Sequence, residues 1–190
     1  MQVRACSWIG RIFFACVLGL AALLVAGCQG SVWQMIPTPL PTFTPEGASL
    51  PMATIRQGLF FSEQYYTAKQ PAIVVVARPE EIVQIEQWLD DEILAGLKSI
   101  DYEKQLVIVV FQGAGPSDRN AEVKVVARSG SIVTVVAYFN EPPKGAPREL
   151  TLASPYHIVA VEKVGEWDAT FTFRLVVQGE VVAETTQFVP

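Results

Sequence analysis

The apolar residues form one long run near the N-terminus and shorter, patterned runs farther along the chain. Residues 12–26 read IFFACVLGLAALLVA and contain no charge, and Arg4 and Arg11 precede them. A membrane-spanning helix needs about 20 apolar residues. A basic start, a shorter apolar run and small residues after it are instead typical of a secretory signal peptide. The pattern therefore predicts a signal peptide over residues 1–27.

From residue 53 onward the pattern predicts a folded domain made mainly of strands. Residues 72–77 (AIVVVA) and 105–111 (QLVIVVF) are apolar and rich in β-branched side chains, as in strands that are buried on both faces. Residues 170–178 alternate, with Phe171 and Phe173 on one face and Val176 on the other. We expect a hairpin turn at Ser129-Gly130 and further strands at 59–66, 121–128, 131–140, 156–163 and 181–188.

One segment has helical spacing. Pro79 suits the first turn of a helix, and acidic residues follow it near the positive end of the helix dipole. Apolar side chains then recur at Ile82, Ile85, Leu89 and Ile93. The spacing predicts one amphipathic helix over about residues 79–96. With a single helix among many strands, we expect an α+β domain over 53–190 whose core is a mainly antiparallel sheet or is sandwich-like.

A proline-rich segment separates the predicted signal peptide from the domain. Residues 29–51 hold five of the 13 prolines of the chain, interleaved with threonines. Such a segment favours polyproline II and extends by roughly 3.1 Å per residue. We therefore expect residues 28–52 to be a tether. The alternative is a packed loop in which Trp33, Met35 or Phe43 contacts the domain.

The end of the signal peptide carries a second pattern. Leu24-Val25-Ala26-Gly27-Cys28 resembles the lipobox of bacterial lipoproteins, in which an aliphatic residue and two small residues precede a cysteine. The resemblance implies cleavage between Gly27 and Cys28 and acylation of the Cys28 thiol. Two or three acyl chains would anchor the protein stably, since each buried CH₂ contributes roughly 0.8 kcal/mol. An ordinary secretory signal with a chance cysteine is the alternative.

Cleavage changes the charge and the cysteine content. The net charge shifts from −5 to −7 because Arg4 and Arg11 are removed. Nucleic-acid binding needs clustered Lys and Arg, so this acidic balance argues against it. Cys6 and Cys16 leave with the signal peptide, and Cys28 is the predicted lipid site. The predicted domain therefore has no thiol for a disulfide, a nucleophile or a metal site.

Two segments of the predicted domain resemble the PrcB C-terminal domain family. Residues 100–111 (IDYEKQLVIVVF), with Gly113 after them, resemble the segment that leads into a buried strand of that family. Residues 154–161 (SPYHIVAV) resemble its PYHIV strand, and residues 142–145 (PPKG) stand where the family has a proline-containing loop. The resemblance spans about 58–165 and leaves 166–190 as an added C-terminal hairpin. Members are commonly lipoproteins, and the family is named for a subunit that stabilises a surface protease complex. The resemblance implies protein binding or scaffolding rather than catalysis.

The loop 112–120 (QGAGPSDRN) is rich in turn residues. It lacks the Gly-Lys-Ser/Thr ending of a phosphate-binding loop and the Gly-Gly-Tyr ending usual in the PrcB family. Ser117 does not lie in a nucleophile elbow. We expect a surface turn that presents Asp118 and Arg119 at an exposed tip, and these two are the candidate binding residues.

Few other residues suggest chemistry. His157, the single histidine, lies in an apolar strand with no recognisable partner, so we expect a structural role. Residues 90–92 (DDE) point in different directions from a helix and are expected to be solvated rather than to bind a metal. We predict no catalytic residue, metal or cofactor. Trp167, Tyr138 and Phe139 are either partner contacts or core residues.

These observations favour a non-enzymatic lipoprotein, anchored on the extracytoplasmic face of the cell membrane or envelope, that binds or stabilises an envelope protein, with a surface protease as one candidate. Two alternatives stay open. A small-molecule or glycan receptor needs a pocket with convergent polar groups. A hydrolase that uses Asp118, His157 or Ser117 needs those side chains close together.

Overall fold

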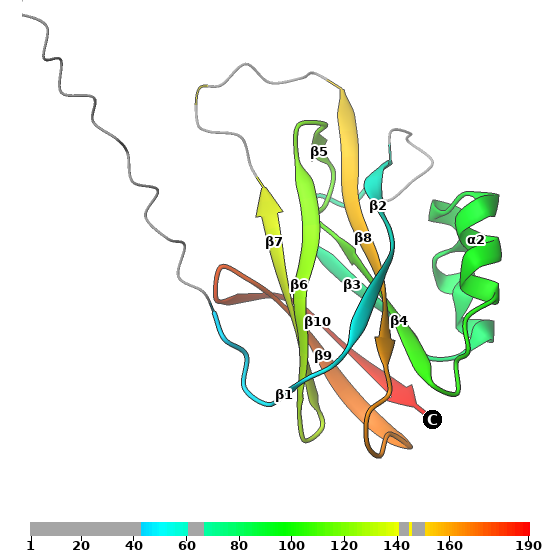
Figure 1. Cartoon of the computed structure of the whole chain (residues 1–190). Coiled ribbons are helices and arrows are strands. Elements are labelled where there is room, and N and C mark those ends of the chain that lie inside the picture. Colours follow the sequence, from blue (N-terminus) through cyan, green and yellow to red (C-terminus); the bar gives the residue numbers. More distant parts are fainter. Residues whose placement is uncertain (1–42, 61–66, 141–144, 146–150) are drawn as a thin grey trace, which may run out of the picture. The chain divides into compact units, whose positions relative to one another are not determined.

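The computed structural model describes residues 43–60, 67–140, 145 and 151–190, which form two β-sheets packed face to face (Figure 1). Sheet A has the strand order β1 (Ala48–Ser49), β6 (Asn120–Ser129), β7 (Ile132–Asn140), β9 (Ala169–Val177) and β10 (Glu180–Val189). Sheet B has the order β2 (Met52–Phe60), β8 (Leu152–Glu162), β4 (Gln105–Phe111) and β3 (Ala72–Val76), and β5 (Gly115–Pro116) pairs with β8. The predicted α+β class with a mainly antiparallel, sandwich-like core is confirmed.

One ladder of the described strands is parallel. The chain leaves sheet A after β7, forms β8 in sheet B and returns as β9, which pairs with β7 in parallel from Ile132↔Thr172 to Ala137↔Val177. The hairpin β9–β10 then completes sheet A. The hairpin expected over residues 166–190 is present, and it is an integral part of the domain, because Phe173 and Leu175 of β9 are fully buried in the core between the sheets.

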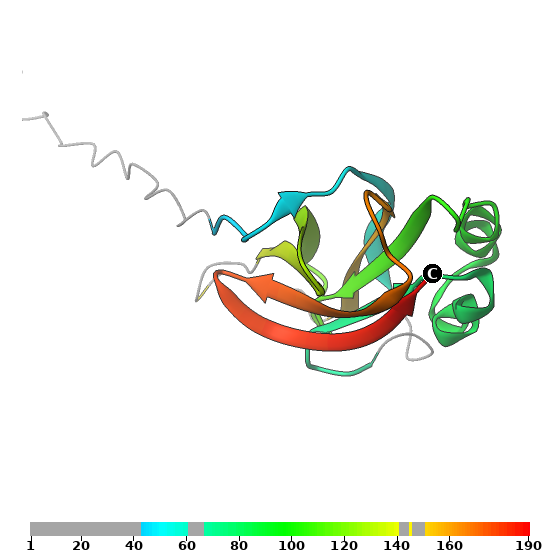
Figure 2. The ribbon, with the colours of Figure 1, turned by 90° about the horizontal axis from the view of Figure 1, so that it is seen from below.

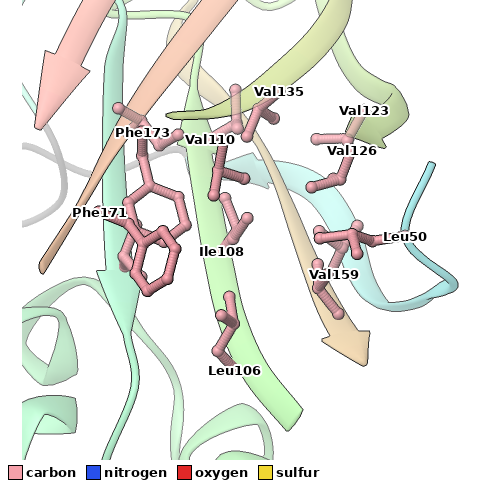
Figure 3. Close-up of a cluster of buried hydrophobic side chains, with 14 of the residues drawn as sticks. Leu50, Leu106, Ile108, Val110, Val123, Val126, Val135, Val159, Phe171 and Phe173 are labelled. Atoms are coloured by element: carbon pink, nitrogen blue, oxygen red, sulfur yellow. The ribbon is translucent and has the colours of Figure 1, made fainter. Parts of the chain in front are cut away.

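The main core fills the space between the sheets (Figure 3). Alternate residues of β4 (Leu106, Ile108 and Val110) face Val135 of β7 and Phe173 of β9, and all five have no exposed surface. Burial of each such side chain stabilises the fold by about 1.5–3 kcal/mol. The continuous apolar run of β4 is explained by a second core on the other face of sheet B.

Helical segments cover that other face of sheet B. They are two 3₁₀ helices, η1 (Pro79–Gln84) and η2 (Glu86–Trp88), and one α-helix, α2 (Asp91–Lys98). Figure 2 shows them on the far side of β3 and β4 from β6 and β7. Ile85 and Leu97 are fully buried and belong to the same apolar cluster as Val109 and Phe111 of β4.

The described residues contain one α-helix, as predicted, but its bounds are not 79–96: only Asp91–Lys98 is α-helical, and the segment before it forms the two 3₁₀ helices. The backbone is extended at Leu89 (φ −116°, ψ 146°), and α2 starts anew after Asp90. The Asp90 carboxylate accepts a hydrogen bond from the Ile93 N–H at 2.8 Å, as an N-cap does. The acidic run 90–92 is thus a helix start, where the dipole favours negative charge. The described residues contain no cluster of side chains that could hold a metal.

The domain begins earlier than predicted. Ala48 and Ser49 pair with β6, and Leu50 is buried in the main core, so the end of the predicted tether 28–52 belongs to the sandwich. The first long strand covers 52–60 rather than 59–66, and residues 61–66 lie outside the described part. The turn between β6 and β7 comes one residue later than expected, since Ser129 pairs with Ile132.

The predicted signal peptide, Gly27, Cys28 and most of the predicted tether also lie outside the described residues. Within the described ranges, no helix is long and apolar enough to cross a membrane.

Candidate functional site

The loop after β4 is not the exposed tip that the sequence predicts. Its Gly115 pairs with Ala153 through the short ladder between β5 and β8, and the Ser117 N–H donates to the Thr151 carbonyl at 3.1 Å. Ser117 is buried, and Asp118 and Arg119 are half-buried. This pairing folds the loop onto sheet B and leaves the two candidate binding residues little free surface.

The same loop contains a buried amide. Gln112 is only 4% exposed, and neither its Nε2 nor its Oε1 has a hydrogen-bond partner in the described structure. Gly113 beside it has φ +97°, and a Cβ there would overlap the Lys69 main chain. Glycine is required at this position, since a side chain would meet both the strained backbone angle and the neighbouring carbonyl group.

His157 lies on β8 and is 2% exposed. Its Nδ1 accepts a hydrogen bond from the Val123 N–H of β6 at 2.7 Å, and its Nε2 lies 3.0 Å from Oγ1 of Thr54 on β2. Because Nδ1 is an acceptor, the neutral ring carries its proton on Nε2, which donates to Thr54. Burial lowers the pKa of His157 below its ordinary value of 6.5.

These contacts fit the predicted structural role of His157. Both ring nitrogens are engaged within the sandwich, so in this arrangement the imidazole is not free to act as a base toward Ser117.

A buried carboxylate that the sequence reasoning missed holds the helical layer to both sheets. Glu81 of η1 accepts hydrogen bonds from the Ala77 N–H at 2.8 Å, from Arg78 Nη2 at 2.7 Å and from Gln187 Nε2 of β10 at 2.7 Å. Burial and the nearby Glu81 charge raise the pKa of Tyr102 to about 12. The acid after Pro79 was visible in the sequence, but its partner 106 residues away was not.

Two open surface depressions lie at loop ends of the sandwich. The first, about 560 Å³, contains the exposed ion pair of Lys104 and Asp101 and is bordered by Lys163, whose Nζ donates to the main-chain oxygens of Tyr102 and Pro190. Burial lowers the pKa of Lys163. The cations at this depression are thus engaged within the protein.

The second depression, about 600 Å³, lies beside a stacked cation. The Arg128 guanidinium sits 4.5 Å from the ring centre of Trp167 and 4.6 Å from that of Phe171. Trp167 is buried and belongs to the main core. Arg128 therefore closes the end of the core, and neither depression has the deep apolar walls with convergent polar groups that a small-molecule site needs.

One row of the face of sheet A that points away from sheet B is apolar across four strands, whereas the next row along the strands includes Thr134, Arg174 and Glu184. Val125 of β6 pairs with Val136 of β7, Val136 with Val176 of β9, and Val176 with Val181 of β10, so these side chains form a row that we name the valine row. No described helix or strand packs over this row, whereas α2 and the 3₁₀ helices cover sheet B. The alternation in 170–178 had placed Val176 on this face correctly.

The surroundings of the valine row are weakly charged. Arg174 pairs with Glu184 at 2.7 Å, and Lys124 pairs with Glu122 at 2.6 Å. Within the row only Val181 is exposed (56%), and the exposed apolar residues Val182 and Tyr138 lie on the same two strands as row members. Phe188 is also exposed, but it pairs with Thr170, beyond Arg174 and Glu184. Tyr138 is therefore on the surface, while Phe139 packs against the core.

Comparison of the chain with protein-family models, with curated proteins and with solved structures finds no match. The resemblance to the PrcB C-terminal domain family stays a prediction that rests on residues 100–113 and 154–161.

Proposed function

We propose that this chain is a lipid-anchored extracytoplasmic protein whose domain binds and stabilises another protein of the cell envelope. The observation that carries the proposal is the valine row, in which Val181 is 56% exposed, Val125 and Val136 are half-buried and Val176 is buried, together with the exposed Val182 and Tyr138. Exposed apolar side chains that gather on one face mark protein-interaction sites more often than random surface does. The opposite sheet hides its equivalent face under helices.

The charges around the valine row indicate what kind of surface the partner presents. Because Arg174 and Lys124 already have carboxylate partners, the face offers no strong net charge to an acidic or basic ligand. The surface that fits it is apolar and weakly charged. A surface protease as this partner is implied by the family resemblance alone.

Anchoring follows from the lipobox. The predicted mature chain is acidic, so charge does not draw it to anionic headgroups, and the acyl chains on Cys28 supply the membrane affinity. The partner is therefore expected in the same membrane or at its surface.

Site-specific crosslinking in intact cells tests the proposal. A photoreactive amino acid at Val181 is expected to capture one protein reproducibly. The matched control is Val83 of η1, which is 62% exposed but belongs to the helical layer on sheet B. Capture of no specific protein from Val181, or the same products from both positions, would contradict the proposal.

A further inference from the structure

At the N-terminal end of β6, the backbone groups on the edge of the strand form hydrogen bonds with side chains rather than with another strand. β1 pairs only with Ala127 and Arg128, and the Leu50 N–H reaches the Val126 carbonyl. Beyond this point the partners come from sheet B: His157 accepts from the Val123 N–H, and Gln57 Nε2 donates to the Ala121 carbonyl at 2.8 Å. Side chains of β8 and β2 thus join the two sheets here.

Irregularities in both neighbouring strands accompany this junction. β6 has a bulge between Val123 and Val125, and β2 has one between Thr54 and Arg56. A bulge re-aims backbone groups out of the regular ladder. The bulges lie next to the two residues that contact the imidazole, Val123 and Thr54, and the Val123 N–H is directed at Nδ1 of His157 instead of at a neighbouring strand.

The contact with Val123 requires the neutral ring. A backbone N–H is only a donor, so its partner must keep a lone pair on Nδ1. Protonation of Nδ1 would place two N–H donors opposite each other in a buried position, with their nitrogen atoms 2.7 Å apart and no acceptor between them. The ring cannot turn over to escape this, because a protonated imidazole carries N–H on both nitrogens.

We propose that His157 is an acid-sensitive latch between the two sheets. Protonation of its Nδ1 breaks the hydrogen bond to Val123 and releases the N-terminal part of β6 from β8. The latch does not depend on the proposed partner. It would let a domain exposed to the external medium loosen one defined edge when that medium becomes acidic. The edge that opens carries the unpaired N–H of Val123.

The charged groups around His157 nearly balance, so they do not prevent protonation of its ring. Its charged neighbours on β6 are Glu122, which favours the protonated ring, and Lys124, which disfavours it. The two oppose each other and form an ion pair at 2.6 Å. The adjacent positions on the other packed strands hold uncharged Thr54 and Gln57 on β2 and Val110 on β4. Burial is the largest influence, and it lowers the pKa of His157.

The direction of the pH effect follows from this lowering. The folded state binds its proton less readily than the unfolded state, whose histidine has the ordinary pKa of 6.5. Stability is therefore fully present above pH 6.5 and falls as the pH decreases below it. Within that window, one proton changes the equilibrium by up to about tenfold per pH unit.

The test is residue-resolved amide exchange on the ¹⁵N-labelled full chain in detergent, corrected for the intrinsic pH dependence of exchange. From pH 7.5 to pH 5, the Val123 amide of the wild type is expected to lose about tenfold or more of its protection. The Val135 amide in the middle of β7 serves as the internal control. In His157→Asn, the amide oxygen can take the place of Nδ1, so protection of Val123 is expected at both pH values.

A second variant keeps the test decisive if the first folds poorly. In His157→Gln the longer side chain places its oxygen toward Thr54, so the Val123 amide is expected to exchange freely at both pH values. Equal pH dependence of Val123 protection in the wild type and in His157→Asn would overturn the latch. So would imidazole ¹⁵N shifts that place the proton on Nδ1 at pH 7.5.

Discussion

Replacement of Glu81 by alanine tests whether one buried carboxylate holds the helical layer to the sandwich. The side chain is 9% exposed and accepts hydrogen bonds from Ala77, Arg78 and Gln187. Its loss leaves the buried Ala77 N–H without an acceptor and frees the side chain of Gln187 from η1. The effect is therefore expected at two places, the end of β3 and the last residues of β10.

The magnitude can be worked from these contacts. An orphaned buried N–H costs about 1–3 kcal/mol, and the lost contact with Gln187 adds about 0.5–1.5 kcal/mol. The pair with Arg78 counts for little, because the arginine side chain is 49% exposed. The sum is about 1.5–4.5 kcal/mol, which for a domain of about 150 residues lowers Tm by roughly 3–18 °C.

The assay is urea and thermal unfolding followed by circular dichroism, with Glu80→Ala as the matched control. Glu80 is adjacent, carries the same charge and is exposed. Glu81→Gln keeps one acceptor oxygen and should lose about half as much stability. A Glu81→Ala domain that unfolds within about 0.5 kcal/mol of Glu80→Ala would refute the role assigned to this carboxylate.

Four further substitutions have expected outcomes. Gly113→Ala should destabilise the domain by about 1–3 kcal/mol in urea unfolding, since a Cβ would overlap the Lys69 main chain at φ +97°. Gly96→Ala, in α2 with no atom near its Cβ position, should stabilise it by about 0.5–1 kcal/mol, and equal effects of the two alanines would contradict this reasoning. Gln112→Met should be neutral or stabilising by up to about 2 kcal/mol, because the buried amide has no partner among the described residues; a loss above about 1 kcal/mol would contradict this. Cys28→Ser should release the protein from membranes, and mass spectrometry of membrane-extracted wild type showing an unmodified Cys28 thiol would exclude the lipid anchor.

The sequence predicts best those strands in which every residue is buried in a similar apolar environment. Residues 105–111 are apolar throughout because β4 has a core on each face, and β4 coincides with that range. The break at Leu89–Asp90 was missed because apolar spacing is compatible with one helix or with several short ones. Asp90 offered a signal, since aspartate is a favoured N-cap.

The site residues were harder to predict because their neighbours come from distant parts of the chain. Asp118 and Arg119 are half-buried only because two residues without a strand pattern, Gly115 and Pro116, pair with β8. The burial of His157 fits the structural role expected for it, but its contact with Val123 depends on how the two sheets meet. The valine row similarly requires the register of four strands, including a parallel pair that alternation alone does not reveal.

The return of the chain from β8 to β9 has a consequence for folding. The last strands supply Phe173, Leu175 and Val189 to the main core, so that core is incomplete until the final residues of the domain are available. Pairings between distant segments also slow folding, because a long loop must close before the contacts form. A growing chain that lacks β9 and β10 therefore has an unfinished main core, and the domain is expected to gain its full stability only after these last strands are synthesised.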